Sequence, residues 1–249
     1  MMAPVSATAP PANPFSTRFV RPDRTDYRFA AGQDADAVAG AAIAQLNHCG
    51  TAAIIGPHGT GKSTLLHTLM PRLQAAFAHV QLVRLSSTSQ AVQELRRSLE
   101  EQATAGDECA VQPRCLVIDG FEQLPWLVRQ RLIGRSRRWA AKRRRGRRAA
   151  AGTGLLVTAH RAQLRVPTLF WTGWDDELVS DLTAEKLCDL PEPTRQTMLR
   201  LAAEHAARLQ HSRPAARNVR DYWFTLYDEY ERLRAHHSSA AAPRRENAR

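Results

Sequence analysis

The sequence is poor in cysteine, aromatic residues and long hydrophobic runs, and each shortage excludes a class of protein. Its four cysteines, Cys49, Cys109, Cys115 and Cys188, form no C-x-x-C pair, so we expect neither a disulfide scaffold nor a zinc site. No apolar stretch approaches the roughly 18 residues of a membrane-spanning helix. The first residues lack both the basic start and the apolar core of a secretory signal, so no such signal is expected. The sequence therefore predicts a cytoplasmic protein without a membrane partner.

The length of 249 residues is sufficient for one α/β core and a small appendage. Residues 1–13 and 237–249 are rich in Ala, Pro, Ser and Arg and lack an apolar period, so both are predicted to be disordered tails. We expect the core, with an N-terminal arm packed on it, to span residues 14–180. Residues 181–236 are expected to form a helical lid.

A glycine-rich segment is the strongest local signal. Residues 51–64 read TAAIIGPHGTGKST, a short β-type run followed by a match to G-x-x-x-x-G-K-[ST]. Glycines let successive N–H groups turn inward around a phosphate, and Lys62 and Ser63 are suited to hold phosphate oxygens and Mg²⁺ respectively. The alternative, a turn whose lysine only faces water, is disfavoured by the helical pattern that follows. The predicted nucleotide-binding residues are Gly56, Pro57, His58, Gly59, Thr60, Gly61, Lys62, Ser63 and Thr64.

Short apolar runs alternate with amphipathic segments along most of the chain. This alternation predicts an α/β fold with a parallel sheet covered on both faces. Strands are expected at residues 52–55, 79–85, 115–119, 154–158 and 177–182. Helices are expected at residues 34–46, 91–101 and 194–209, and from an N-cap at Asn218 onwards.

Asp119 ends the buried run Cys115–Asp119 and is a candidate metal ligand. Ligands of open α/β sheets bind at the carboxyl ends of the strands, which is where this carboxylate is expected. An aspartate in this position is also a common turn residue. Its pairing with the glycine-rich loop favours a Mg²⁺ site shared with Ser63.

Three segments together carry a family resemblance. GPHGTGKS, LVIDGFEQL and LLVTAH are similar to the Walker A, Walker B and sensor-1 motifs of AAA+ and related STAND-type ATPases. The resemblance implies a P-loop NTPase core of strand order 5-1-4-3-2 with a small C-terminal helical lid, and it implies ATP and Mg²⁺ as ligands. It further implies that Thr158 is the sensor-1 residue, although threonine also suits a strand end by propensity alone. The N-x-R sequence Asn218-Val219-Arg220 resembles the sensor-2 motif, which implies that Arg220 contacts the γ-phosphate; a solvated arginine is the alternative.

The sequence departs from this family directly after Asp119. These ATPases place the water-activating glutamate there, whereas this chain has Gly120, so Glu122 becomes the nearest candidate catalytic base. Its equally plausible alternative is a first-turn helix residue favoured by the helix dipole. Oligomerisation is left open, since related ATPases present an arginine finger from the segment that Arg161 and Arg165 occupy here.

The positive charge is concentrated in one segment. Residues 129–148 contain eleven Lys or Arg and no acidic residue, which equals the net charge of +11 of the whole chain. Such a block is typical of binding to nucleic acid or another polyanion, and a solvated helix is the alternative. We call Arg129–Arg148 the basic block.

The combined interpretation is an ATP-binding P-loop protein, a slow Mg²⁺-dependent ATPase or a nucleotide switch. Two alternatives remain: an ATP-binding nucleic-acid adaptor without turnover, and a small-molecule kinase that uses the basic block as a lid. Kinases usually place the metal-binding strand beside the loop strand, so the strand order separates these classes. The chain lacks the N-K-x-D motif that reads guanine, which favours ATP.

Overall fold

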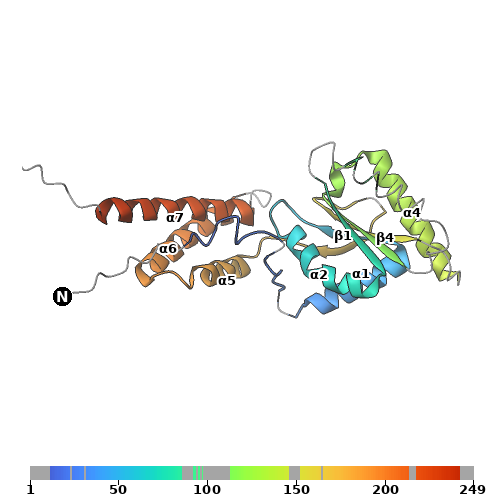
Figure 1. The fold of residues 1–249 in the computed structure, drawn as a ribbon, viewed down its shortest axis with the longest axis horizontal. Helices are drawn as coiled ribbons and strands as arrows, with labels where there is room; N and C mark the ends of the chain where they lie inside the picture. Colours follow the sequence, from blue (N-terminus) through green and yellow to red (C-terminus); the bar gives the residue numbers. More distant parts are fainter. Residues whose placement is uncertain are drawn as a thin grey trace, which may run out of the picture. The chain divides into compact units, whose positions relative to one another are not determined.

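The structure is a computed structural model, and it describes residues 12–22, 24–30, 32–85, 92–93, 95, 97, 113–145, 152–163, 165–212 and 217–241. The chain divides into two compact units (Figure 1). The first, the core unit, is residues 25–173, and the second, the helical unit, joins the residues up to Arg24 to those from Trp174 onwards. The division at residue 173 precedes the expected boundary at residue 180.

A parallel sheet forms the centre of the core unit. Within the described residues its strands are β1 (Thr51–Ile55), β2 (His79–Arg84), β3 (Arg114–Asp119), β4 (Thr153–Ala159) and β5 (Thr168–Trp171). Their order is β2-β3-β4-β1-β5, and every pair is parallel. Read from the other edge this is 5-1-4-3-2, so the predicted α/β fold class and strand order are confirmed.

Helices cover both faces of this sheet. Successive strand residues point to opposite faces, so apolar strands such as β1 present apolar side chains on both faces, and both must be covered. In β1, Ala52 and Ile54 pack with α1 (Ala35–Cys49) and α2 (Lys62–Ala76). Ala53 and Ile55 instead join the cluster on the other face, which includes residues of α4 (Trp126–Arg144). β1 is buried throughout, as expected of a central parallel strand.

The predicted fifth strand at residues 177–182 is wrong. Those residues lie in α5 (Asp176–Leu187), where the Asp175 side chain accepts a hydrogen bond from the Leu178 amide at 3.0 Å. This cap, with Asp176 and Glu177 in the first turn, starts a helix because carboxylates offset the positive end of the helix dipole. The strand that pairs with β1 on this side is β5, a four-residue edge strand.

The helical unit consists of α5, α6 (Glu192–Gln210), α7 (Val219–Ala241) and the described N-terminal residues. Phe15 is fully buried with residues of all three helices, and the Asn13 side-chain amide donates to the Tyr227 carbonyl at 3.1 Å. Residues of the expected arm are thus divided: those up to Arg24 belong to the helical unit, whereas Tyr27 and Phe29 pack in the core unit. A cap at Asn218 starts α7, as predicted, because its side chain accepts from the Arg220 amide at 2.9 Å.

Some expectations fall on segments that are described only in part. The expected tails include residues 1–11 and 242–249, which lie outside the described residues, but helix α7 extends to Ala241, past the predicted start of the C-terminal tail at residue 237. Of the expected helix 91–101, the described positions 92, 93, 95 and 97 are helical. No helix in the described part of the chain is both long and apolar enough to span a membrane.

Candidate functional site

The glycine-rich loop joins the carboxyl end of β1 to the start of α2, the connection that the sequence predicts. Gly59 and Gly61 adopt φ values of 69° and 87°, a region that favours glycine. Gly56 is required for a different reason. A Cβ there would lie 2.2 Å from both the carbonyl oxygen and the hydroxyl of Thr172. The three glycines therefore allow a turn that larger residues would distort.

Thr172, near the last residue of the core unit in sequence, holds the glycine-rich loop in place. Its Oγ1 lies 2.7 Å from the Oγ1 of Thr60, which also lies 2.9 Å from the Pro57 carbonyl oxygen. Its backbone amide donates to the Ile55 carbonyl at 2.7 Å, so the residue continues the pairing of β5 with β1. Sequence reasoning missed Thr172 because a lone threonine 112 residues from its partner gives no local signal.

Lys62 is buried at the first position of α2. Its ammonium group donates to the carbonyls of Gly56 at 2.8 Å and Pro57 at 2.6 Å. The His160 Nδ1 atom is 3.2 Å away. The lysine charge is thereby held within the loop, where the helix N-terminus adds positive potential.

Ser63, Asp119 and Thr158 form a hydrogen-bonded set beside the loop. The Ser63 hydroxyl donates to Asp119 Oδ2 at 2.7 Å, and the Thr158 hydroxyl donates to Asp119 Oδ1 at 2.6 Å. Thr158 also accepts from the Gly120 amide at 2.8 Å and is almost fully buried. Arg84, at the end of β2, brings its Nε within 3.7 Å of Asp119 Oδ2. Adjacent strand ends thus converge on one carboxylate.

The oxygen atoms of this set fit Mg²⁺. The ion prefers hard oxygen ligands, and it is usually held by one or two protein groups together with phosphates and water. Ser63 and Asp119 supply two converging oxygens. Among the described residues there is no cluster of three or more His, Cys, Asp or Glu side chains that could hold a metal ion.

Glu122 lies in the short 3-10 helix η2 (Phe121–Gln123) and is paired with His160. The distance from His160 Nε2 to Glu122 Oε1 is 2.9 Å. The other ring nitrogen, His160 Nδ1, lies 3.2 Å from the Lys62 ammonium and 3.3 Å from the Gly56 carbonyl oxygen, so the imidazole bridges the loop and Glu122. The other carboxylate oxygen, Oε2, is buried without a hydrogen-bond partner in the described part of the chain. Glu122 therefore has one oxygen oriented by His160 and one buried oxygen whose acceptor capacity no described residue uses.

His160 is the residue whose importance the sequence understated. Besides Glu122 and Lys62 it contacts His58, whose ring centroid lies 3.5 Å away. The signal available in the sequence was its position two residues beyond Thr158, at the carboxyl edge of the sheet. His58 itself is exposed at the loop surface, whereas Thr64 is half-buried in the first turn of α2.

The remaining candidates form no hydrogen bond or ion pair with this set in the described part of the chain. Arg220 belongs to the helical unit, where it is exposed in the first turn of α7. The basic block falls on α4 as far as Arg144, and residues 146–148 lie outside the described residues. Arg161 and Arg165 are both exposed.

Comparison with solved structures relates this fold to known proteins. Drosophila ORC bound to DNA gives a TM-score of 0.50 at 13% identity, covering 86% of this chain and 65% of that chain. This chain therefore shares its fold with that structure. The C. elegans protein PCH-2 gives 0.43 at 15% identity, with 81% and 69% covered. The replication initiator DnaA bound to AMPPCP and single-stranded DNA gives 0.47 at 14% identity, with 84% and 67% covered.

The likeness to the ORC structure shows the fold alone. This chain spans about two thirds of the length of these three structures. No protein-family model and no curated protein matches its sequence. Fold and loop together support nucleotide binding in general, while the identity of the nucleotide depends on the side chains of the site.

Proposed function

We propose that this protein binds MgATP through its glycine-rich loop and works as a slow ATPase or a nucleotide switch. The observation that supports this most directly is the hydrogen-bonded set of Ser63, Asp119 and Thr158 beside the buried Lys62. It combines a cation for phosphate with two oxygens for Mg²⁺ at the end of a glycine-rich loop. Bound MgATP would supply the reactive γ-phosphoryl group and a metal ion that offsets its charge.

Each protein group has a distinct part in this proposal. Lys62 offsets phosphate charge, and Ser63 and Asp119 hold the metal. Thr158 positions the Asp119 carboxylate, since its hydroxyl proton is directed at Oδ1. It would sense the γ-phosphate through that hydrogen bond.

Glu122 is the proposed general base. His160 orients one carboxylate oxygen at 2.9 Å, which leaves Oε2 to accept a proton from water. Arg220 completes the proposal as a sensor-2 residue that would couple the nucleotide to the helical unit.

The decisive experiment measures Mg²⁺-dependent ATP binding and turnover in wild type and in Asp119→Ala. We expect the variant to lose most of the affinity gained from Mg²⁺, because Ser63 alone remains as a metal ligand. Asp181→Ala is the matched control, as it removes an exposed aspartate of α5. Wild-type Mg²⁺ dependence in the Asp119 variant would reject the proposed metal site.

A second candidate function is a nucleic-acid adaptor that binds ATP without hydrolysing it. The observation in its favour is that α4 exposes a series of cations and has no acidic residue: Arg131, Arg135, Arg137, Arg138, Lys142, Arg143 and Arg144. ORC and DnaA are seen bound to DNA, and the shared architecture makes the same class of partner our proposal here. ATP binding without turnover, with DNA or RNA present or absent, would favour this function.

The kinase alternative receives less support. The notable feature is that β4 lies between β1 and β3, so the strand of Asp119 does not neighbour the loop strand. Kinases usually place these strands side by side. The strand order therefore disfavours a kinase.

A further inference from the structure

A basic pocket lies at the amino-terminal edge of β1, at the opposite end of that strand from the glycine-rich loop. Its volume is about 680 Å³. Thr51 begins β1 and Gly56 follows it, so the two sites are separated by the length of a five-residue strand, roughly 17 Å. Residues that contribute charge or hydrogen-bonding capacity to the pocket are His48, Thr51, Arg137, Arg138, Arg144 and Arg165. All of them belong to the core unit.

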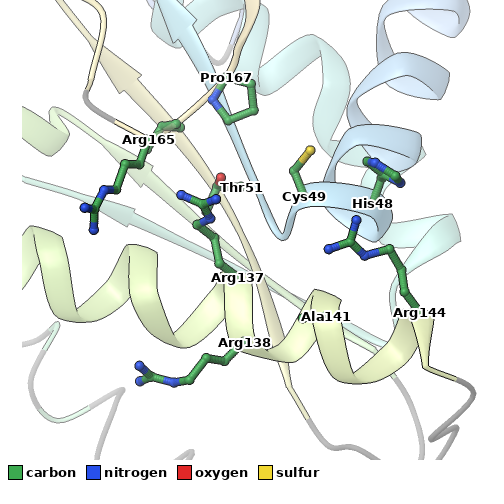
Figure 2. A pocket seen from close by; sticks show the side chains of 10 residues that line it. His48, Cys49, Thr51, Arg137, Arg138, Ala141, Arg144, Arg165 and Pro167 are labelled. Atoms are coloured by element: carbon green, nitrogen blue, oxygen red, sulfur yellow. The ribbon is translucent and has the colours of Figure 1, made fainter.

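Three segments far apart in sequence build this pocket (Figure 2). His48 and Cys49 end α1, Arg137 and Arg144 lie on α4, and Arg165 precedes β5. Figure 2 shows Arg137 extending from α4 toward Thr51.

The end of α1 is closely packed against the middle of α4 beside the pocket. A Cβ on Gly50, which follows α1 at φ 78°, would lie 2.2 Å from the Ser136 carbonyl oxygen. The α1–α4 junction therefore leaves no room for a side chain, which fixes the cations of both helices relative to each other.

The described residues supply no counter-charge to the pocket. The side chains of Arg137, Arg138, Arg144 and Arg165 form no hydrogen bond or ion pair with any described residue. Among the described residues that line the pocket there is no carboxylate. Like charges gathered around one cavity repel one another, so an anion that enters it relieves this repulsion.

Two further features indicate that the pocket is built for a ligand. The hydroxyl of Thr51, a fully buried residue of the pocket wall, has no hydrogen-bond partner in the described part of the chain. A buried hydroxyl without a partner costs free energy, which a ligand oxygen would recover. Arg165 adopts φ 66°, the only non-glycine residue with positive φ among those described. Such conformations are strained and concentrate at functional sites.

We propose that this pocket binds phosphate groups of a nucleic-acid backbone, at a site separate from the nucleotide loop. Guanidinium forks match phosphate oxygens in geometry, and a hydroxyl such as that of Thr51 can add a hydrogen bond. A polynucleotide is favoured over an isolated anion because further exposed cations follow along the same helix, Lys142 and Arg143 within it and Arg145 at its C-cap. Contacts to backbone phosphates carry no base information, so binding in the pocket is expected to depend on backbone charge and not on sequence.

This inference deepens the adaptor function, on which it rests for the source of the phosphate. It changes which protein residues are expected to affect nucleic-acid binding. Binding by the basic block alone would depend on the number of cations removed from α4. Binding in the pocket depends on particular groups, including Arg165, Thr51 and the neighbouring Cys49, which lie outside that block.

The test compares two double variants of the full chain that remove equal charge. Arg137→Gln with Arg165→Gln changes the pocket, while Arg131→Gln with Arg135→Gln changes two exposed arginines of α4 that do not line it. Affinity for short single-stranded and duplex DNA is measured by fluorescence anisotropy. We expect the pocket variant to lose roughly tenfold or more in affinity relative to the control pair, because it lacks charge-assisted hydrogen bonds to phosphate. MgATP affinity should be unchanged in both.

Alkylation of Cys49 gives an independent measure of pocket occupancy. Cys49 lines the pocket and is partly exposed, whereas Cys188 is exposed in the helical unit and serves as the internal reference. We expect DNA to slow the alkylation of Cys49 and not that of Cys188 in wild type. Equal losses of affinity in the two double variants, or an unchanged Cys49 rate at saturating DNA, would overturn the proposal.

Inorganic pyrophosphate identifies the source of the phosphate. Protection of Cys49 by pyrophosphate, abolished in the pocket variant, together with no DNA binding, would overturn the nucleic-acid assignment and the adaptor function. Loss of ATP binding would be a separate result, since it concerns Lys62 and Asp119 at the other end of β1. Failure of the pocket and failure of the nucleotide site are thus distinguishable.

Discussion

Lys62 is the only buried lysine among the described residues, and its ammonium group lies inside the glycine-rich loop. We expect Lys62→Ala to abolish detectable ATP binding in calorimetry, because the loop loses the cation that offsets phosphate charge. The fold should persist, since the lysine contacts loop carbonyls and not the hydrophobic clusters. Lys142→Ala, which removes an exposed lysine of α4, is the control and should bind normally. Undiminished MgATP affinity in folded Lys62→Ala would refute the site.

Glu122 allows binding and chemistry to be separated. Glu122→Gln keeps the size of the side chain but removes its basicity. Turnover should fall by roughly 10²–10⁴-fold, as is usual when a general base is removed, while ATP stays bound. Steady-state hydrolysis and equilibrium binding are measured on the same preparation. If the variant turns over at the wild-type rate, Glu122 has no part in the mechanism and belongs to the helix start.

Cys115 predicts a pH dependence of stability. Burial raises the pKa of this thiol from 9.0 to about 12. Above pH 9.0 the unfolded chain loses the thiol proton while the folded chain retains it, so the folded state is progressively disfavoured as the pH rises to about 12. The expected loss is about 1.4 kcal/mol per pH unit.

Urea denaturation at a series of alkaline pH values checks this expectation. Cys115→Ala should have a lower free energy of unfolding at neutral pH, because it leaves a cavity beside β3. Its stability should nevertheless fall less steeply above pH 9.0 than that of wild type. Parallel curves for the two proteins would show that the thiol does not contribute.

At the scale of elements, helix α5 depends on its first turn. Asp175→Ala removes the side chain that accepts from the Leu178 amide, and N-caps of this kind contribute about 1 kcal/mol. We expect the free energy of unfolding to fall by about that amount in urea denaturation. Asp175→Asn retains an acceptor and should stay close to wild type. If alanine and asparagine have the same effect, the cap does not stabilise α5.

At the scale of the whole molecule, the concentrated charge predicts a strong dependence of nucleic-acid binding on salt. Replacing Lys142, Arg143, Arg144 and Arg145 by Gln should remove most of the binding. The slope of log K against log salt should flatten by about 0.9 for each duplex-DNA phosphate that the variant no longer neutralises, or up to roughly 3.6 in all. ATP affinity should not change. Wild-type protein that shows no salt-sensitive binding to DNA or RNA would make the basic block a solvated surface.

The sequence by itself determined the elements whose signals are local. The glycine spacing and the lysine of the loop identified the phosphate-binding turn, and the apolar run ending at Asp119 identified a buried strand. Apolar alternation set the α/β class, and the family resemblance gave the strand order that the sheet confirms. These features depend on backbone preferences and side-chain periodicity within about ten residues, which any sequence displays directly.

Tertiary structure alone decided which distant residues meet. β5 was missed because it is a four-residue edge strand whose apolar run, Leu169 to Trp171, is only three residues long. The contact of His160 with Lys62 joins residues 98 positions apart, and the basic pocket joins α1, α4 and the segment before β5. Such contacts depend on the order of the strands in the sheet and on how the helices pack against it. No local pattern records them, because their free energy arises only when the fold brings those segments together.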